Sequence, residues 1–233
     1  MSRLVRGATE VRWARGALIV RHPSGTVLVD VPSGIEEDLG EALGELSAIV
    51  LTSGRIRTTA GLLGLLAALE PHRDPELPLR LHVPWGEERG AALADTWSRL
   101  WPGRFPVEVD AERAGAVIEV GEIEITTHPI RAGEPHWQQG TVEAVPAVAL
   151  TLVTPDLSAT LLPSCTPSSG GQRLCTGVDL AVVEVAAAPW PRIGEGQPVW
   201  RATPGRAIEL VAGAGEAWLV GDDGRWLGDD RPV

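Results

Sequence analysis

The chain lacks Lys, Asn and Tyr altogether, so all 20 of its basic residues are Arg. Its formal net charge is −11, which argues against a general nucleic-acid-binding protein, because such a protein presents a basic face to the phosphates. Codons rich in G and C would explain the exclusive use of Arg. A role for Arg in planar contacts with carboxylate or phosphate groups is the alternative, and composition alone does not choose between the two.

Long hydrophobic runs are also missing. No stretch approaches roughly 18 uninterrupted apolar residues, which argues against a transmembrane helix and a membrane partner. The N-terminal stretch MSRLVRGATEVRWARG contains Arg but no apolar segment of the signal-peptide type, so a cytoplasmic protein is expected. In such a chain the two cysteines, Cys165 and Cys175, predict free thiols. No two of the five His residues have the spacing of a local zinc motif.

The chain has 233 residues, enough for one large domain or two small ones, and 44% of them are hydrophobic, which allows a sizeable core. We expect a single domain over 1–233, with a short β-rich C-terminal tail from about residue 207. The Pro- and Gly-rich stretch 187–206 is the only candidate boundary, and we expect it to be a long surface loop.

The first half alternates between strand and helix patterns. Strands are expected within 10–31, over 48–52 and over 79–83, and helices over 33–47, from about 59 to 70 and over 84–101. Ser33 is expected to cap the first of these helices. On the last one, Leu93, Trp97, Leu100 and Trp101 are expected to share the buried face. Such alternation predicts an α/β layer.

The second half carries hairpin patterns. Two pairs of short alternating runs, 116–120 with 123–130 and 146–154 with 158–164, are each separated by turn residues. The run 179–186 is typical of a buried strand, and 206–230 of short strands around Gly and Asp turns. The second half is therefore expected to be mostly β-structure.

The clearest pattern is the stretch 49–69, IVLTSGRIRTTAGLLGLLAAL, in which a buried strand leads through a polar loop into an apolar helix. Together with the hairpin start, "LVD" and the later "DLAVVEVA", it resembles the metallo-β-lactamase superfamily over roughly residues 10–190. The resemblance implies an α/β (α+β) fold, a four-layer α/β/β/α sandwich with two metals at one edge of the inner sheets. "TTAGLL" and "LLPSCTPSSG…VDLAVVEV" are similar to the pyrroloquinoline quinone biosynthesis protein B family, although this chain is shorter and lacks that family's Asp-His pair.

The resemblance also implies where metal ligands would stand. The family's His-x-His-x-Asp-His loop matches positions that here carry Ser53, Arg55, Arg57 and Thr58. An Arg side chain stays protonated and cannot ligate a dication. The sequence therefore predicts no family-type metal centre, no cofactor and no catalytic residue in this loop.

The remaining family ligands are altered as well. The resemblance places a further ligand His near Arg131 and a bridging Asp at Cys165, and no His follows position 136 to supply the last ligand. A relocated metal site built from His128, His136 and Cys165 is a weaker alternative. Ordinary residues at a sheet edge are the simpler interpretation of the same three positions.

The loop itself allows two interpretations. Ser53, Arg55, Arg57 and Thr58 precede a helix N-terminus, where hydroxyls, guanidinium groups and free N–H groups suit an anion, and Arg131 and Cys165 would complete the pocket. Alternatively, the Arg side chains pair with nearby acids. The resemblance brings Asp30 and Glu184 to the same edge.

These observations predict a catalytically degenerate member of the fold, a pseudoenzyme that acts as a binding or assembly partner for a protein or a small anionic ligand. One alternative is an active metal-dependent hydrolase or oxidoreductase with relocated ligands, and another is a small-molecule anion-binding module. A nucleophilic enzyme is a further possibility, with Ser53, Ser164 or Cys165 as nucleophile and His128 or His136 as base.

The nine Trp residues bear on a protein partner. Trp97 and Trp101 are expected in the core. The others in loop-like or hairpin segments could anchor a partner or fill the core of a chain that has one Phe; they are Trp137, Trp190, Trp200, Trp218 and Trp226. No self-complementary patch can be identified, so the oligomeric state stays open.

Overall fold

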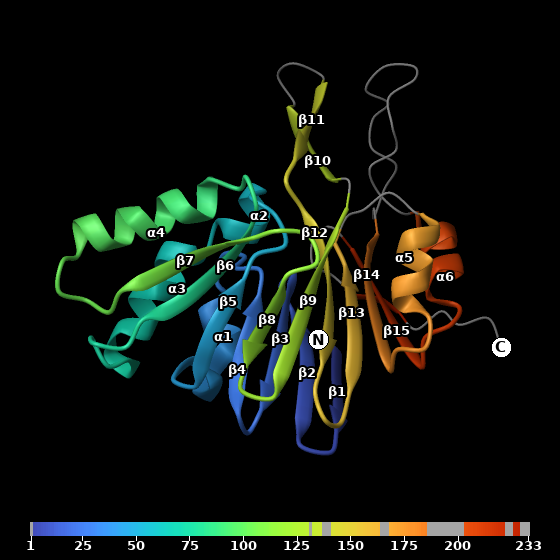
Figure 1. Ribbon diagram of the computed structural model, residues 1–233, viewed down its shortest axis with the longest axis horizontal. Helices are drawn as coiled ribbons and strands as arrows, with labels where there is room; N and C mark the ends of the chain where they lie inside the picture. The colour runs from blue at the N-terminus through green and yellow to red at the C-terminus, as the bar shows by residue number, and fades with distance from the viewer. Residues whose placement is uncertain are drawn as a thin grey trace.

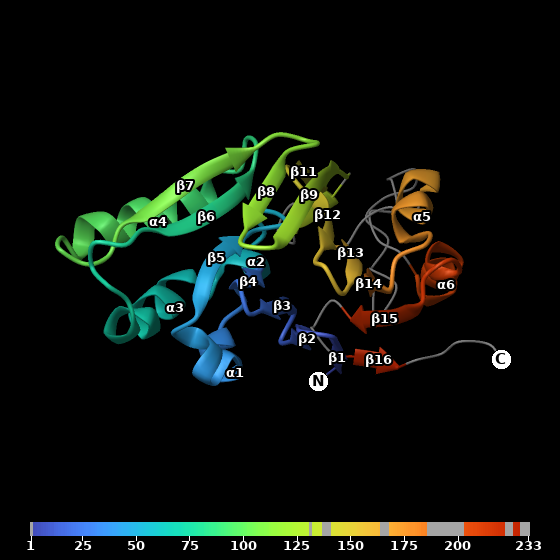
Figure 2. The ribbon, with the colours of Figure 1, turned by 60° about the horizontal axis from the view of Figure 1, so that its bottom comes forward.

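The computed structural model describes residues 2–130, 132–136, 141–163, 168–185, 203–221 and 226–228, except for the side chains of 133–136, 141–143 and 226–228. Two seven-stranded sheets face each other, and helices cover the outer face of each (Figures 1 and 2). This is the predicted four-layer α/β/β/α sandwich of the α/β (α+β) class.

The first sheet contains its seven strands in chain order. Its first four strands are antiparallel neighbours joined by tight turns, whereas β4, β5, β6 and β7 run parallel and need helical crossovers. The strands are β1 (Ser2–Arg6), β2 (Thr9–Ala14), β3 (Ala17–His22), β4 (Gly25–Val29), β5 (Leu46–Val50), β6 (Leu79–Pro84) and β7 (Val107–Glu112).

Helices fill these crossovers on the outer face. They are α1 (Ile35–Leu39), α2 (Ile56–Thr59), α3 (Leu62–Leu69) and α4 (Arg89–Leu100), with the short 3₁₀ helices η1 (Gly40–Leu43) and η2 (Glu70–His72). Leu62, Leu65 and Leu66 of α3 are buried in the hydrophobic core on this side of the sheet, as their helical spacing requires.

The second sheet has the order β16-β15-β14-β13-β12-β9-β8, and α5 (Ser169–Cys175) and α6 (Pro204–Val211) pack on its outer face. Its strands are β8 (Val117–Val120), β9 (Ile123–Pro129), β12 (Val148–Val153), β13 (Ser158–Leu162), β14 (Leu180–Val185), β15 (Glu216–Gly221) and β16 (Trp226–Gly228). A separate two-stranded ribbon pairs β10 (Ala132–His136) with β11 (Thr141–Val145).

Three hydrophobic cores separate the four layers. One lies between the first sheet and its helices, a second between the two sheets, and a third between the second sheet and α5 and α6. Strand β14 lies between parallel neighbours and is buried along its whole length, which explains the continuous apolar pattern of its sequence.

The helix predicted over 33–47 is wrong in its extent and its cap. Helix α1 ends after Leu39, because Gly40 adopts φ +54°, and Leu46 already belongs to β5. The N-cap residue is Gly34, in a left-handed conformation without a side-chain cap, rather than Ser33. The helix expected over 84–101 begins only at Arg89, since Pro84 ends β6. Of its four expected buried residues, Trp97 is buried, whereas Leu100 and Trp101 are exposed.

The C-terminal tail departs further from its predicted secondary structure. Residues Pro204–Val211 form helix α6 instead of short strands, with Pro204 in the first turn, where its missing N–H costs nothing. Strand β15 is an interior strand of the second sheet, and its Trp218 is buried in the core between the sheets. Trp137, Trp190, Trp200 and the Trp226 side chain lie outside the described residues, as does most of the expected loop 187–206.

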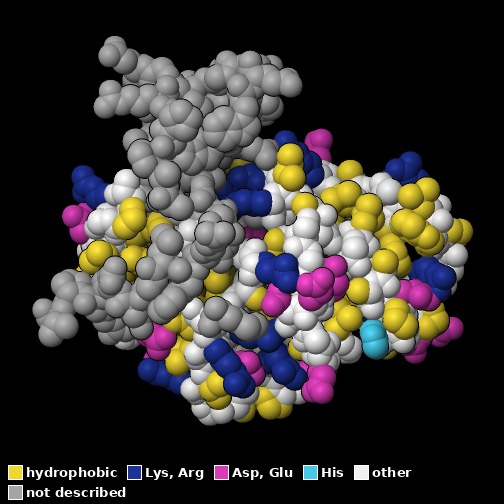
Figure 3. All heavy atoms as spheres, turned by 180° about the vertical axis from the view of Figure 1, so that it is seen from behind, with side chains coloured by type: hydrophobic (Ala, Val, Ile, Leu, Met, Phe, Trp, Pro, Cys, Tyr) yellow, Lys and Arg dark blue, Asp and Glu magenta, His cyan; other side chains and the backbone are white. Residues whose placement is uncertain are grey.

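The surface mixes both signs of charge. On the face shown in Figure 3, basic and acidic side chains are interspersed among the described residues. Exposed ion pairs such as Arg15–Glu37 and Arg21–Glu45, each with an N–O distance of 2.7 Å, follow this pattern. Among the described residues, no helix has the length and apolar character needed to cross a membrane.

Candidate functional site

The loop that leaves β5 joins the two sheets at one edge of the sandwich. Ser53 forms an isolated antiparallel bridge with Ala147, and the N–H of Val148 donates to the carbonyl of Thr52 at 2.9 Å. Because β12 begins at Val148, this loop is attached to the second sheet while it continues from the first. The side chains of the loop therefore lie where residues of both sheets can meet.

The loop is held by its own hydroxyl groups. Thr58 Oγ1 donates to the carbonyl oxygens of Ser53 (2.7 Å) and Arg55 (2.8 Å), which closes the turn before α2. The N–H of Gly61 donates to the carbonyl of Val31 at 2.8 Å, and a Cβ on Gly61 would lie 2.2 Å from the carbonyl oxygen of Pro32. This close approach is the physical reason for glycine in "TTAGLL".

Two guanidinium groups meet one buried carboxylate at this edge. Arg55 and Glu184 are each 3% exposed, and Arg55 Nη2 lies 3.8 Å from Glu184 Oε2. Arg55 Nε also donates to Ser53 Oγ at 3.0 Å. The Arg57 side chain is 31% exposed and forms an ion pair with Glu184 Oε1. We call Arg55, Arg57 and Glu184 the arginine cluster; it matches the interpretation in which the Arg side chains pair with Glu184.

Asp30 lies beside this cluster at the carboxyl end of β4. It is buried with φ +64°, and Thr52 binds both of its carboxylate oxygens, through the backbone N–H and through Oγ1, each at 2.7 Å. Burial raises the pKa of Asp30 to about 6, against the opposing effects of the Thr52 hydrogen bonds and of the Arg55 and Arg57 charges. The Arg charges therefore act on the second expected carboxylate as well.

The donor set of the arginine cluster does not fit a divalent metal ion. A guanidinium group has five N–H donors, a fixed positive charge and no lone pair to offer. The one carboxylate of the cluster already accepts from Arg57 and lies within ion-pair distance of Arg55. A dication placed here would meet two positive charges at close range.

The other predicted site residues do not join this cluster in the described structure. His128, on β9, forms a hydrogen bond between its Nε2 and Thr151 Oγ1 at 3.0 Å, and burial lowers its pKa. Arg131, Ser164, Cys165 and the side chain of His136 lie outside the described residues. The relocated metal site and the candidate nucleophilic pairs therefore stay predictions.

A second cluster, which sequence reasoning missed, lies on β6 and β7. His82 Nδ1 is 2.8 Å from Glu112 Oε1 and 3.8 Å from Asp110 Oδ2, and one donor atom from each of the three residues lies within 4.8 Å of the others. In the described part of the chain, this is the one group of at least three His, Cys, Asp or Glu residues with that proximity. We call it the carboxylate cluster. Its sequence signal is the alternation of polar with apolar residues in "LRLHV" and "VEVDAE".

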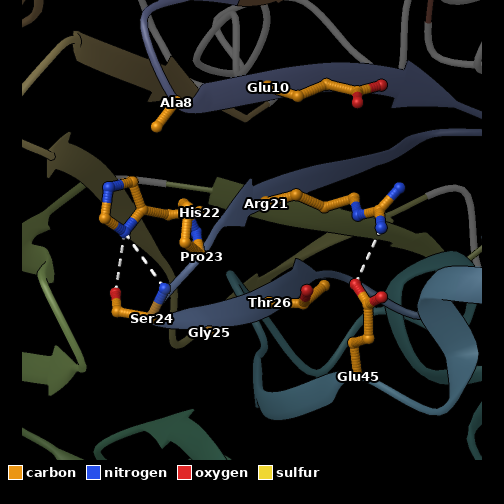
Figure 4. Close-up of a pocket in the computed structure, with 9 residues that line it drawn as sticks. All are labelled: Ala8, Glu10, Arg21, His22, Pro23, Ser24, Gly25, Thr26 and Glu45. Atoms are coloured by element: carbon orange, nitrogen blue, oxygen red, sulfur yellow. Dashed lines mark hydrogen bonds and ion pairs between the residues drawn. The ribbon is translucent and has the colours of Figure 1, made fainter.

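The described structure also has a cavity of about 520 Å³ near the β3–β4 turn, drawn in Figure 4. That turn lies at the other end of β4 from Asp30. Inside the cavity, Arg21 pairs with Glu45, and His22 Nδ1 lies 2.8 Å from Ser24 Oγ. None of the residues predicted for the functional site lines it, so it is a separate feature.

Solved structures of other proteins share the architecture of this chain. No protein-family model matches the chain, and no curated protein sequence does. Solved structures do match. The metallo-beta-lactamase fold protein YhfI from Bacillus subtilis has a TM-score of 0.63 and 15% identity, over 88% of this chain and 77% of that one.

Two further solved structures are similar over most of this chain. Human tRNase Z, short form, has a TM-score of 0.67 and 16% identity over 93% of this chain and 90% of its own. Zn²⁺-bound PqqB from Methylobacterium extorquens has a TM-score of 0.65 and 16% identity over 90% of this chain and 77% of its own. At these identities the likeness is one of fold, and it confirms the fold that the sequence predicted. The chain therefore has the metallo-β-lactamase fold.

Proposed function

We propose that this chain is a catalytically degenerate protein of the metallo-β-lactamase fold, which acts as a binding or assembly partner instead of a metal-dependent enzyme. The observation that carries the proposal is the arginine cluster. Its two guanidinium groups stand at positions that the sequence resemblance assigns to metal ligands, and both face Glu184.

Charge explains why such a replacement is stable. A metal site at this edge would hold carboxylates against a divalent cation. Here the positive charge comes from Arg55 and Arg57, so the buried carboxylate of Glu184 is compensated without a metal ion. The same two charges also act on Asp30. They lower its pKa, in opposition to burial, which raises it.

The surface beside this cluster supports a binding role. Arg57 is partly exposed and can offer its guanidinium group to an anionic ligand. Ile56 and Trp85 are exposed hydrophobic side chains that follow the carboxyl ends of the neighbouring strands β5 and β6. Arg113 stacks over the Trp85 ring at 4.6 Å. Exposed side chains of these types suit a protein partner that carries an acidic group.

A metal-dependent hydrolase or oxidoreductase is the second candidate, and the carboxylate cluster is the observation that favours it. That cluster contains one imidazole and two carboxylates, which are ligand types for Zn²⁺. The solved structures of similar fold include the Zn²⁺-bound PqqB, whose metal is a property of that protein.

Turnover assays separate the two candidates. A β-lactam and a nitrophenyl phosphodiester would be incubated with the protein after addition of Zn²⁺, Mn²⁺ or Fe²⁺. We expect no metal-dependent hydrolysis. Turnover that disappears in Asp30→Asn, but not in the distant control Arg21→Gln, would overturn the proposal. Turnover that disappears in Glu112→Gln would favour the second candidate.

Binding is tested with inorganic phosphate as the probe. We expect phosphate to raise the melting temperature of the wild-type protein and to lose most of this effect in Arg57→Gln. Arg21→Gln is the matched control, because Arg21 also pairs with a Glu but lies near the β3–β4 turn, at the opposite end of β4 from Asp30. An equal response in all three proteins would exclude this edge as the anion site.

A further inference from the structure

We infer that the carboxylate cluster of His82, Asp110 and Glu112 is a binding site for a divalent transition-metal ion of the Zn²⁺ type. The site is separate from the arginine cluster, and the inference does not rest on the proposed function. It is carried by the strand register, the burial of His82 and the charges around the cluster.

Strand register brings the three side chains to one face. Strands β6 and β7 are parallel, with His82 opposite Asp110 and Pro84 opposite Glu112. Leu81 and Val83, which flank His82, belong to the core on the helix side of the sheet. Since side chains alternate along a strand, His82 and its two acidic neighbours project from the opposite face.

The backbone under the cluster is fixed on both sides. The N–H of Leu51 donates to the carbonyl of His82 at 2.8 Å, and the N–H of Trp85 donates to the carbonyl of Glu112 at 2.8 Å. Side chains on paired strands are held more precisely than side chains on loops. This rigidity is what a metal site requires of its supporting structure.

Burial of the three side chains is graded. The His82 side chain is 5% exposed, Glu112 is 21% exposed and Asp110 is 47% exposed. The Nδ1 atom of His82 faces the two carboxylates, whereas its buried Nε2 has no hydrogen-bond partner among the described residues. A cation entering past the exposed Asp110 side chain would meet Nδ1 and both carboxylates, and would replace the hydrogen bond between Nδ1 and Glu112 Oε1.

The local charge also favours a cation. Two carboxylates share one imidazole, and no Arg of the described residues lies within ion-pair distance of Asp110 or Glu112. By contrast, the buried acids Glu184 and Asp30 have a basic partner and an N–H donor, respectively. A bound dication would supply the missing positive charge.

The distances between donor atoms are close to those of a metal site. Ligand atoms at about 2.0–2.2 Å from one zinc ion lie about 3.0–3.5 Å from each other. The observed separations from His82 Nδ1 are 2.8 Å to Glu112 and 3.8 Å to Asp110. The first is slightly shorter and the second slightly longer than this range, so small rotations of the Glu112 and Asp110 side chains would complete the geometry. Three protein ligands leave a coordination position for water, and an imidazole ligand favours Zn²⁺ or Co²⁺ over Mg²⁺.

Metal titration tests the site directly. The full chain is stripped with a chelator and titrated with Zn²⁺ by calorimetry, and with Co²⁺ by its visible absorption spectrum. We expect one equivalent per chain and a Co²⁺ spectrum of low coordination number. Glu112→Gln and Asp110→Asn should each weaken binding about tenfold or more, because each removes a charged ligand.

Two control variants make the result decisive. Glu108→Gln changes a carboxylate on the same strand outside the cluster and should bind as the wild type does. Asp30→Asn should also leave binding unchanged; loss of Zn²⁺ in that variant would place the metal at the arginine cluster and overturn the inference. Wild-type affinity in both cluster variants, no binding by the wild type, or displacement of Zn²⁺ by equal Mg²⁺ would each contradict it.

Discussion

The arginine cluster joins the loop after β5 to β14 of the second sheet, whereas the carboxylate cluster lies on β6 and β7 of the first, and the two clusters differ in how their acids are compensated. At the end of β5, two guanidinium groups compensate the buried Glu184. On β6 and β7, two carboxylates meet one imidazole and no described Arg. The same fold can therefore place positive charge in different ways. The arginine cluster supplies it from its own side chains, whereas the carboxylate cluster would obtain it from a bound cation.

The largest expected effect tests whether the arginine cluster is held by its carboxylate. Glu184→Gln keeps the shape of the side chain but removes the buried negative charge that Arg55 and Arg57 face, so we expect the free energy of unfolding to fall by about 3–5 kcal/mol. Urea denaturation measures this change. Glu45→Gln at the exposed Arg21 pair is the control and should cost less than about 1 kcal/mol. Equal losses in the two variants would remove the distinction between a buried cluster and a surface ion pair.

A slightly smaller effect follows from Asp30, the acid that no guanidinium group fully compensates. Its pKa rises from 3.8 to about 6 on folding. The folded chain therefore keeps a proton that the unfolded chain releases, and the free energy of unfolding should fall by about 2 kcal/mol between pH 4 and pH 6 from this group alone.

Asp30→Asn isolates this contribution. Asn tolerates the positive φ of this position and can both accept from the Thr52 N–H and donate to Thr52 Oγ1. We expect the variant to lose this part of the pH dependence and to be at least as stable as the wild type at pH 7. Parallel stability curves for the two proteins over this pH range would show that Asp30 does not titrate as its burial requires.

A third prediction concerns the frame that both clusters share. Gly61→Ala would place a Cβ against the backbone of Pro32, so we expect it to destabilise the protein by about 1–3 kcal/mol. Gly64→Ala, one turn later in α3, meets nothing closer than 3.9 Å and should stabilise the helix by about 0.5–1 kcal/mol. If this contact sets the position of the loop, the melting temperature should fall in Gly61→Ala and rise in Gly64→Ala.

The sequence was informative where its patterns are local. The strand "AIVLT", the Gly-Leu start of the next helix and the two hairpins of the second half could be predicted from periodicity, and the resemblance supplied the layers. The same resemblance put Arg55, Arg57 and Glu184 at one edge, so their pairing was available as one of two interpretations. Helix α6 was missed because Gly and Pro around 204–215 favoured turns, whereas packing against the second sheet stabilises a helix there.

The carboxylate cluster could not be predicted because it depends on register between distant segments. His82 and Asp110 lie opposite each other only because β6 and β7 pair in parallel across a crossover that contains α4. Strand β7 was not predicted at all, since "VEVDAE" combines acidic residues with a weak apolar alternation. His82 therefore had no visible partner in the sequence and counted only as one of five scattered His residues.

The most direct test of the account is the position of zinc in a crystal of the full chain soaked with Zn²⁺, located by anomalous scattering at the zinc absorption edge. We predict a peak within coordination distance of His82 Nδ1 and both acids of the carboxylate cluster, and none beside the arginine cluster. A peak next to Glu184 or Asp30, with none at His82, would contradict the account.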